Sequence, residues 1–277
     1  MPYLKLEQPN DPDFQLYYQS YGPSTGQAVI LIHGWPLSHR AWEPQMQVLA
    51  DAGYQVIAYD RRGFGDSSKP YEAYDYSTLA KDLQGLIIGL DLKEVVLVGF
   101  SMGGGEVVRY CTDFGTDRIA KAVLMSSIIP LVPQKEDNPD GVPQEALEEI
   151  MGELQKDRVA YMKEFASNFF NAKEQGVSDQ QVHYAWSIAS YASPRATIEA
   201  AKAWASTDFR EECKNVTVPT LIIHGTGDGI VPIETAGNQA AELIPNNEYH
   251  KIEEAPHGLN LTHKDKVNEL LLNFLKK

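Results

Sequence analysis

The chain has 277 residues, enough to bury a substantial core as one domain or as one domain with an insertion. Its apolar fraction of 43% and charged fraction of 22% are ordinary for a soluble globular protein. With 24 Lys and Arg against 38 Asp and Glu, the formal net charge is −14 at pH 7, which argues against binding to nucleic acid or to an anionic membrane.

Only two cysteines occur, Cys111 and Cys213, so a disulfide framework is excluded although a single pair is not. The segment from Met1 to Ser20 is polar and lacks the charged start and apolar run of a signal peptide. No apolar stretch is long enough to cross a bilayer. We therefore expect a cytoplasmic protein, and the sequence leaves a homo-oligomer open.

Short apolar runs alternate with amphipathic stretches up to Met125 and again from Val218. Several runs are continuously apolar and β-branched, as expected for strands buried on both faces of a parallel sheet. The segments around Leu4–Glu7 and Gln15–Tyr21 are typical of antiparallel edge strands. The predicted buried strands are Ala28–Ile32, Gln55–Tyr59, Val95–Val98, Ala120–Met125 and Thr220–Ile223, and the helices between them are Trp42–Ala52, Tyr76–Leu90 and Gly103–Phe114. This alternation predicts an α/β sheet with right-handed crossovers.

The alternation stops after Met125 and resumes at Val218. A proline-rich, acidic connector over residues 130–143 is followed by helical patterns with no convincing buried strand. These helices are predicted at Glu145–Lys156, Asp157–Phe170, Asp179–Ser190 and Pro194–Thr207. We predict a core of residues 1–129 and 215–277 with a helical cap inserted at 130–214. Strands on both sides favour an insertion over an independent helical domain.

A G-x-S-x-G pattern, Gly99-Phe-Ser-Met-Gly103, follows the Val95–Val98 strand and precedes an amphipathic stretch. A sharp turn between strand and helix lifts such a serine above the carboxyl edge of the sheet and leaves no room for side chains beside it. The helix N-terminus also directs N–H groups toward developing negative charge. Ser101 is therefore the candidate nucleophile, against the alternative of a tight turn with an incidental serine.

A serine needs a base, which in this arrangement comes from a later strand end. His257 lies in the loop Ala255-Pro-His-Gly258, directly after the strand predicted at Glu248–Glu253. His250 lies inside that strand. His263 begins the last helix and is a distant second candidate.

The acid that orients this base is expected in the loop after the Thr220–Ile223 strand. Asp228 is the only carboxylate there, and it would hold the His257 tautomer and stabilise the imidazolium. The alternative is a local turn, which the glycines on both sides would also suit. Asp60 is a rival carboxylate, but it precedes the nucleophile, and we interpret Asp60–Asp66 as a structural segment with paired charges.

The loop His33-Gly-Trp-Pro36 follows the Ala28–Ile32 strand. It lies at the position that supplies the second oxyanion donor in this fold. The donors would be the backbone N–H groups of Trp35 and Met102. His33 and His224 are interpreted as hydrogen-bonded scaffold residues. No cluster has convincing metal spacing, no phosphate loop occurs, and we expect no cofactor.

Together these motifs resemble one branch of the α/β-hydrolase superfamily, the bacterial aryl esterases and cofactor-free (non-heme) chloroperoxidases. The similarity covers nearly the whole chain and does not depart from the family pattern at Ser101, Asp228 or His257. The segments that carry it are His33–Pro36, Tyr59–Gly65, Val98–Gly105, Thr207–Arg210, His224–Asp228 and Ala255–Gly258. An aspartate nucleophile, as in haloalkane dehalogenases and epoxide hydrolases, is absent.

The resemblance implies hydrolysis of small or aromatic esters through an acyl-serine, and perhydrolysis, in which hydrogen peroxide replaces water and yields a peracid. Small-molecule esters, or peroxide with a carboxylic acid, are the implied partners. Lactone or γ-lactam hydrolysis is an alternative, and a catalytically silent binding protein is an alternative of another class. The Trp-Pro pair is similar to that of peroxidase-named members. Pro36 would tilt the Trp35 peptide so that its carbonyl accepts a hydrogen bond from peroxide, against the alternative of a proline that only rigidifies the loop.

The substrate pocket is the least specified part of the prediction. Its walls are expected to come from apolar residues near the strand ends and in the cap, although core packing is an equally good explanation for a cap residue taken singly. The candidates beside Trp35 and Met102 are Pro36, Phe100, Ile128, Phe165, Trp186, Ile230 and Leu259.

Overall fold

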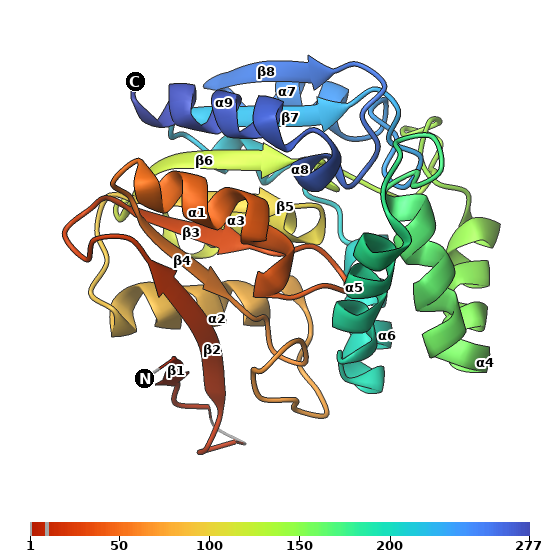
Figure 1. Cartoon of the computed structure of the whole chain (residues 1–277), viewed down its shortest axis with the longest axis horizontal. Helices are drawn as coiled ribbons and strands as arrows, with labels where there is room; N and C mark the ends of the chain where they lie inside the picture. The colour runs from red at the N-terminus through yellow and green to blue at the C-terminus, as the bar shows by residue number, and fades with distance from the viewer. Residues whose placement is uncertain (1, 9–10) are drawn as a thin grey trace.

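The computed structural model describes residues 2–8 and 11–277, which form an eight-stranded sheet flanked by helices (Figure 1). The strand order is β1-β2-β4-β3-β5-β6-β7-β8, with antiparallel pairing of β1 with β2 and of β2 with β4 and parallel pairing elsewhere. The strands are β1 Tyr3–Lys5, β2 Gln15–Tyr21, β3 Ala28–Ile32, β4 Gln55–Tyr59, β5 Val95–Phe100, β6 Ile119–Met125, β7 Thr220–Gly225 and β8 Asn247–Ile252. The predicted α/β class and the antiparallel edge are confirmed.

Each central strand contributes to two apolar cores because successive side chains point to opposite faces of the sheet. In β3, Ile30 and Ile32 pack with the core that contains α2 and α3, whereas Val29 and Leu31 pack with the core that contains α1 and α9. The other parallel strands alternate in the same way. Burial on both faces explains why these strands read as continuous apolar runs.

Helices cover both faces of the sheet. On one face lie η1 and α1 with α8 and α9, and on the other lie α2, α3 and α7 (Figure 1). Their bounds are η1 His39–Trp42, α1 Glu43–Asp51, α2 Tyr76–Gly89, α3 Met102–Phe114, η2 Cys213–Asn215, α7 Gly237–Leu243, α8 Leu259–Thr262 and α9 Lys264–Leu275. The N-terminus of α2 is capped by Asp75, which accepts from the Thr78 N–H. The predicted helices of the core match these within about two residues.

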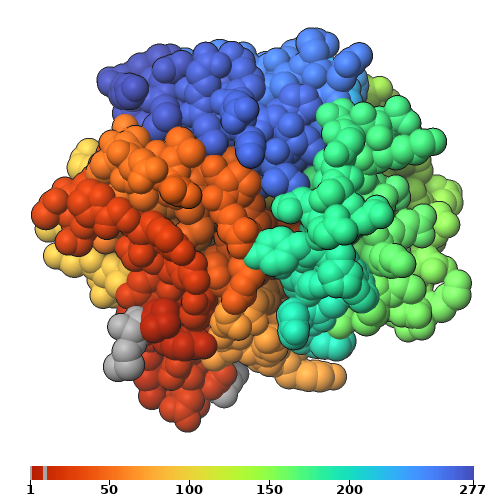
Figure 2. Space-filling view, viewed as in Figure 1, coloured from red at the N-terminus to blue at the C-terminus, as the bar shows by residue number. Residues whose placement is uncertain are grey.

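Three further helices, α4 Gln144–Phe169, α5 Asp179–Ser190 and α6 Pro194–Ser206, lie beyond the carboxyl ends of the parallel strands (Figure 1). The space-filling view shows them as a continuous green and cyan mass beside the core (Figure 2). Helix α4 contains a non-helical residue, Asp157, with φ −153° and ψ 85°. Two helices meeting at this position were predicted, and the kink explains that pattern. No described helix is long and apolar enough to span a membrane.

The connection from β5 to α3 is the tightest turn of the sheet. Ser101 has φ 52° and ψ −119°, a left-handed region that costs energy for a residue with a side chain. A Cβ on Gly99 would lie 2.6 Å from the Gly103 carbonyl oxygen, and a Cβ on Gly103 would lie 2.5 Å from the Ile32 carbonyl oxygen. The glycines therefore let α3 begin directly against β5 and β3.

We expect Gly99→Ala to lower stability by about 2 kcal/mol or more, because backbone atoms rather than flexible side chains meet the new methyl group. Gly152→Ala is the matched control, since Gly152 lies within α4 with nothing within 4 Å of its added Cβ. It should gain about 0.5–1 kcal/mol. Thermal unfolding followed by circular dichroism measures both. Equal melting temperatures for the two variants would contradict this account of the turn.

Candidate active site

Ser101, His257 and Asp228 form a hydrogen-bonded chain at the carboxyl ends of three parallel strands. Ser101 follows β5, Asp228 follows β7, and His257 follows β8. The His257 Nε2 atom lies 2.9 Å from Ser101 Oγ, and His257 Nδ1 lies 2.7 Å from Asp228 Oδ2. An imidazole held between a hydroxyl and a carboxylate can take the hydroxyl proton and remain oriented while it does so.

The surroundings of Asp228 keep its carboxylate ionised although it is buried. Its Oδ1 atom accepts hydrogen bonds from the backbone N–H groups of Ile230 and Val231, at 3.0 and 2.8 Å. Burial by itself raises the pKa of Asp228, but the charge of His257 and hydrogen bonds from His224 and His257 hold that pKa well below its usual value. The orienting group is therefore negative across the physiological pH range.

Aromatic rings fix the plane of the His257 imidazole. The ring centroids of Phe100 and Phe169 lie 5.2 and 5.3 Å from that of His257, and the Phe169 ring stands almost perpendicular to it. The Phe169 carbonyl also accepts a hydrogen bond from the Gly258 N–H at 2.8 Å. The second histidine candidate, His263, lies at the start of α9 and its Nδ1 contacts the Thr262 hydroxyl instead.

The loop after β3 lies directly against the serine. A Cβ on Gly34 would be only 3.0 Å from Ser101 Cβ, so this position admits no side chain. The next residue, Trp35, is buried, and its backbone N–H has no hydrogen-bond acceptor among the described residues. Met102 is the first residue of α3, where backbone N–H groups lack helical partners. These two N–H groups are suited to receive an oxyanion that forms next to Ser101.

A buried ion pair connects this loop to the serine helix. Arg61 Nε donates to Glu106 Oε1 at 2.6 Å, and Glu106 lies on α3. Arg61 Nη2 donates to the His33 carbonyl at 2.6 Å, and the Arg61 N–H donates to His33 Nε2 at 3.0 Å. Burial and the nearby Arg61 charge lower the pKa of His33 well below its ordinary value, so His33 stays neutral. His33 thus serves as a hydrogen-bonded part of the loop.

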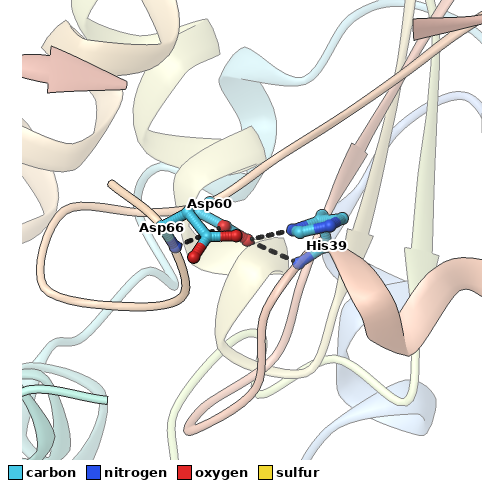
Figure 3. Close-up of side chains that lie close together, drawn as sticks. All are labelled: His39, Asp60 and Asp66. Atoms are coloured by element: carbon cyan, nitrogen blue, oxygen red, sulfur yellow. Dashed lines mark hydrogen bonds and ion pairs between the residues drawn. The ribbon is translucent and has the colours of Figure 1, made fainter. Parts of the chain in front are cut away.

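Asp60 lies in a separate cluster with His39 and Asp66 (Figure 3). Its Oδ1 atom accepts from the His39 backbone N–H at 2.7 Å and contacts His39 Nδ1 at 2.8 Å, while Oδ2 accepts from the Asp66 N–H at 2.8 Å. A Cβ on Gly65 would collide with this carboxylate. These groups have the donor types of a metal site, but the Asp60 oxygens already hold the turn together. The charges of the Asp60–Asp66 segment are paired, as the sequence predicts, and the partner of Asp60 is His39.

A cavity of about 460 Å³ opens above the serine and the histidine. Three predicted wall residues, Ile128, Phe165 and Ile230, line it together with Trp35 and Met102. Other walls come from segments that the sequence did not single out. The further lining residues are Val132, Asp140, Gly141, Val142, Pro143, Ala146, Leu147, Ile150, Tyr161, Trp204, Gly229, Val231 and Pro232.

Four predicted wall residues lie outside the cavity lining. Phe100 lies beneath His257, and Leu259 is fully buried in the core that contains α9. Pro36 is buried in its loop, and Trp186 donates its indole N–H to the Val159 carbonyl at the α4–α5 contact. The sequence does contain a signal for Tyr161. Tyr161, Phe165 and Phe169 recur every four residues and therefore share one face of α4. The path of the 130–143 connector has no such periodic signal.

Comparisons with known proteins show which family the chain belongs to. Residues 27–264 match the family model described as the alpha/beta hydrolase fold. The chain is 44% identical over 279 residues to a putative non-heme chloroperoxidase of Synechocystis sp., covering all of both chains. It is 34% identical to a bifunctional esterase/perhydrolase of Acinetobacter calcoaceticus, covering 94% of this chain and 96% of the relative. The crystal structure of a bromoperoxidase from Bacillus anthracis, 46% identical, superposes with a TM-score of 0.92 over 95% of this chain and 96% of that one.

The depressed pKa of Asp228 predicts how stability depends on pH. A carboxylate whose pKa is lower in the folded state contributes stability that is complete above its unfolded pKa of about 3.9 and is lost as the pH falls toward the folded value. We expect Asp228→Asn to lower the free energy of unfolding by about 1.5–3 kcal/mol at pH 7, with a smaller difference at pH 3. Urea unfolding at several pH values measures this.

The control for that experiment is Asp51→Asn at the exposed end of α1. It should follow the wild-type curve throughout. A wild-type advantage over Asp228→Asn that is constant from pH 7 to pH 3 would contradict the assignment of a low pKa.

Proposed function

Because this chain belongs to the α/β-hydrolase family, we propose that it is a serine esterase that also accepts hydrogen peroxide in place of water. The observation that carries the proposal is the chain of short contacts from Ser101 through His257 to Asp228, at the base of an apolar cavity. In this proposal Ser101 is the nucleophile, His257 the base and Asp228 the orienting acid.

The first half of the reaction makes the acyl-enzyme. His257 Nε2 takes the Ser101 proton as Oγ attacks the ester carbonyl, and Asp228 stabilises the imidazolium that forms. The N–H groups of Trp35 and Met102 bind the negative oxygen of the tetrahedral intermediate. His257 then returns the proton to the leaving alcohol, the carbon–oxygen bond to that alcohol breaks, and the acyl group stays on Ser101.

The second half depends on which small nucleophile reaches the acyl-enzyme. His257 removes a proton from water or from hydrogen peroxide, and the resulting oxygen nucleophile attacks the acyl carbonyl. When the tetrahedral intermediate collapses, Ser101 regains a proton, and the product is a carboxylic acid from water or a peracid from peroxide. The peracid is the species that would oxidise a halide after release. Both branches use the same side chains and the same two backbone donors.

The cavity walls favour an uncharged, apolar acyl group. Trp35, Tyr161, Phe165 and Trp204 give it aromatic surface, and the remaining walls are mostly aliphatic. No lysine or arginine is among the described lining residues, and Asp140 is the only carboxylate among them. An acyl group bearing its own carboxylate would therefore lose hydration without gaining a cationic partner. Small aliphatic and aromatic esters meet this requirement.

We propose that residues 130–214 are a cap that shapes this specificity, inserted into a core formed by residues 1–129 and 215–277. Supporting this, Val142, Leu147, Tyr161 and Trp204 of that segment line the cavity. The Trp35 indole also donates to the Thr197 carbonyl of α6 at 2.9 Å. The cap thus contacts the same loop that supplies one oxyanion donor.

A serine-directed phosphonate tests the nucleophile. We expect a single adduct on Ser101 in the folded wild type, detectable by mass spectrometry. Ser101→Ala should lose the adduct and at least about 10⁴-fold in kcat for a p-nitrophenyl ester, because the variant lacks the hydroxyl that His257 contacts. The matched control is Ser187→Ala, because Ser187 is a half-buried residue of α5 that is not among the described lining residues of the cavity, and this variant should keep both. Folded wild-type protein without an adduct would argue against an enzyme of this class.

Pro36→Leu tests the peroxide branch. If proline orients the Trp35 peptide so that its carbonyl accepts from peroxide, the variant should lower the ratio of perhydrolysis to hydrolysis about tenfold or more, with hydrolysis largely retained. Peracid formation and acid release are measured on one ester with and without hydrogen peroxide. An unchanged ratio would mean that Pro36 only rigidifies the loop.

A further inference from the structure

A second buried histidine contacts the carboxylate that orients His257. His224 lies near the end of β7, four residues before Asp228, and is only 1% exposed. Its Nε2 atom lies 3.2 Å from Asp228 Oδ2, the same oxygen that His257 Nδ1 contacts at 2.7 Å. It also lies 2.9 Å from the Val231 carbonyl oxygen.

These contacts fix which nitrogen of His224 carries the proton. A backbone carbonyl only accepts hydrogen bonds, so Nε2 must be protonated. Its N–H is directed to the Val231 carbonyl, and the same nitrogen lies 3.2 Å from Asp228 Oδ2, close enough for its positive end to act on that carboxylate. The Val231 N–H donates in turn to Asp228 Oδ1 at 2.8 Å. His224 therefore contacts one oxygen of the carboxylate and Val231 contacts the other. The bond between His224 and Val231 also closes the turn from Asp228 to Val231.

His224 is not an alternative base. Among the described residues, His257 is the one whose side chain hydrogen-bonds to Ser101 Oγ, and His224 is not among those that line the cavity. Two further titratable residues near His224 in the described part of the chain lie on β8. They are Tyr249, whose hydroxyl lies beside the same Gly237 as the His224 ring, and Lys251, which is exposed and is the register partner of His224. Phe100 and Phe169 contribute no charge to the other side of His257.

We propose that His224 is a positioning residue for the reaction, one that holds the Asp228 carboxylate against His257 and limits how strongly that carboxylate attracts the His257 proton. This inference rests on the proposed serine esterase function. A neutral imidazole N–H that shares Oδ2 with His257 withdraws part of the negative charge available to the imidazolium. Less of that charge is then available to favour the imidazolium over the neutral base, so the proposal places the acidic limb of the activity profile at a lower pH when His224 is present.

Removing the His224 N–H should therefore move the acidic limb of the pH profile to higher pH. In His224→Leu we expect the midpoint of that limb, measured on kcat/KM, to rise by about 0.5–1 pH unit. We also expect kcat on the plateau to fall about tenfold with little change in KM, because substrate contacts are untouched. His224→Gln, whose amide N–H reaches the position of Nε2, should restore the wild-type midpoint.

Two further variants separate positioning from packing. His224→Asn keeps a polar amide but is too short to reach Asp228, so it should show the raised midpoint. If His224→Leu does not fold, the comparison of His224→Asn with His224→Gln still tests the role of His224. Ile222→Val is the packing control, because Ile222 lies on the same strand and is buried away from the triad. It should lower the melting temperature and leave the midpoint unchanged.

The outcomes distinguish this proposal from the one on which it rests. A wild-type midpoint in both His224→Leu and His224→Asn, or a raised midpoint in His224→Gln, would overturn the role of His224. Absence of esterase activity in the wild type would instead overturn the proposed function.

Discussion

The strained turn at Ser101 is the constraint on which the arrangement of the site depends. With φ at 52°, Ser101 projects from the end of β5, and α3 begins at the very next residue. This is possible only because Gly99 and Gly103 allow α3 to approach both β5 and β3. The same close approach brings Gly34 against the serine, so the loop after β3 and Ser101 share one packing contact. Parallel pairing then delivers Asp228 and His257 to the same edge of the sheet.

Electrostatic pre-organisation follows from burial around this turn. Buried charges are retained only where they are paired or hydrogen-bonded, and each one here has such partners. Asp228 receives two backbone N–H groups and faces two histidines, whereas Arg61 joins Glu106 of the serine helix to the carbonyl of His33. The donors that would meet an oxyanion are thus held by hydrogen bonds that reach into the core, and little reorganisation is needed during the reaction.

Sequence reasoning predicted the sheet well because its strands carry an unambiguous signal. Burial on both faces makes Ala28–Ile32 and Gln55–Tyr59 continuous apolar runs, and their predicted bounds are those observed. Strand-end logic also selected the three residues that the structure brings within hydrogen-bond distance. The cavity walls were harder, because the connector after Pro130 has no period. Its path is set by tertiary contacts such as Asn138 Nδ2 to the Leu131 and Pro133 carbonyls. The contact between His224 and Asp228 likewise depends on how the intervening turn folds back.

The central claim is that one acyl-enzyme on Ser101 is divided between water and hydrogen peroxide. It is tested most directly by rapid-quench mass spectrometry of the wild type with a p-nitrophenyl ester, over a range of peroxide concentrations. We predict an acyl adduct on Ser101 whose steady-state level falls as peroxide rises, while peracid appears and acid release declines in proportion. Two results would contradict the account: peracid formation without any acyl adduct on Ser101, or an adduct that breaks down at a rate independent of the peroxide concentration.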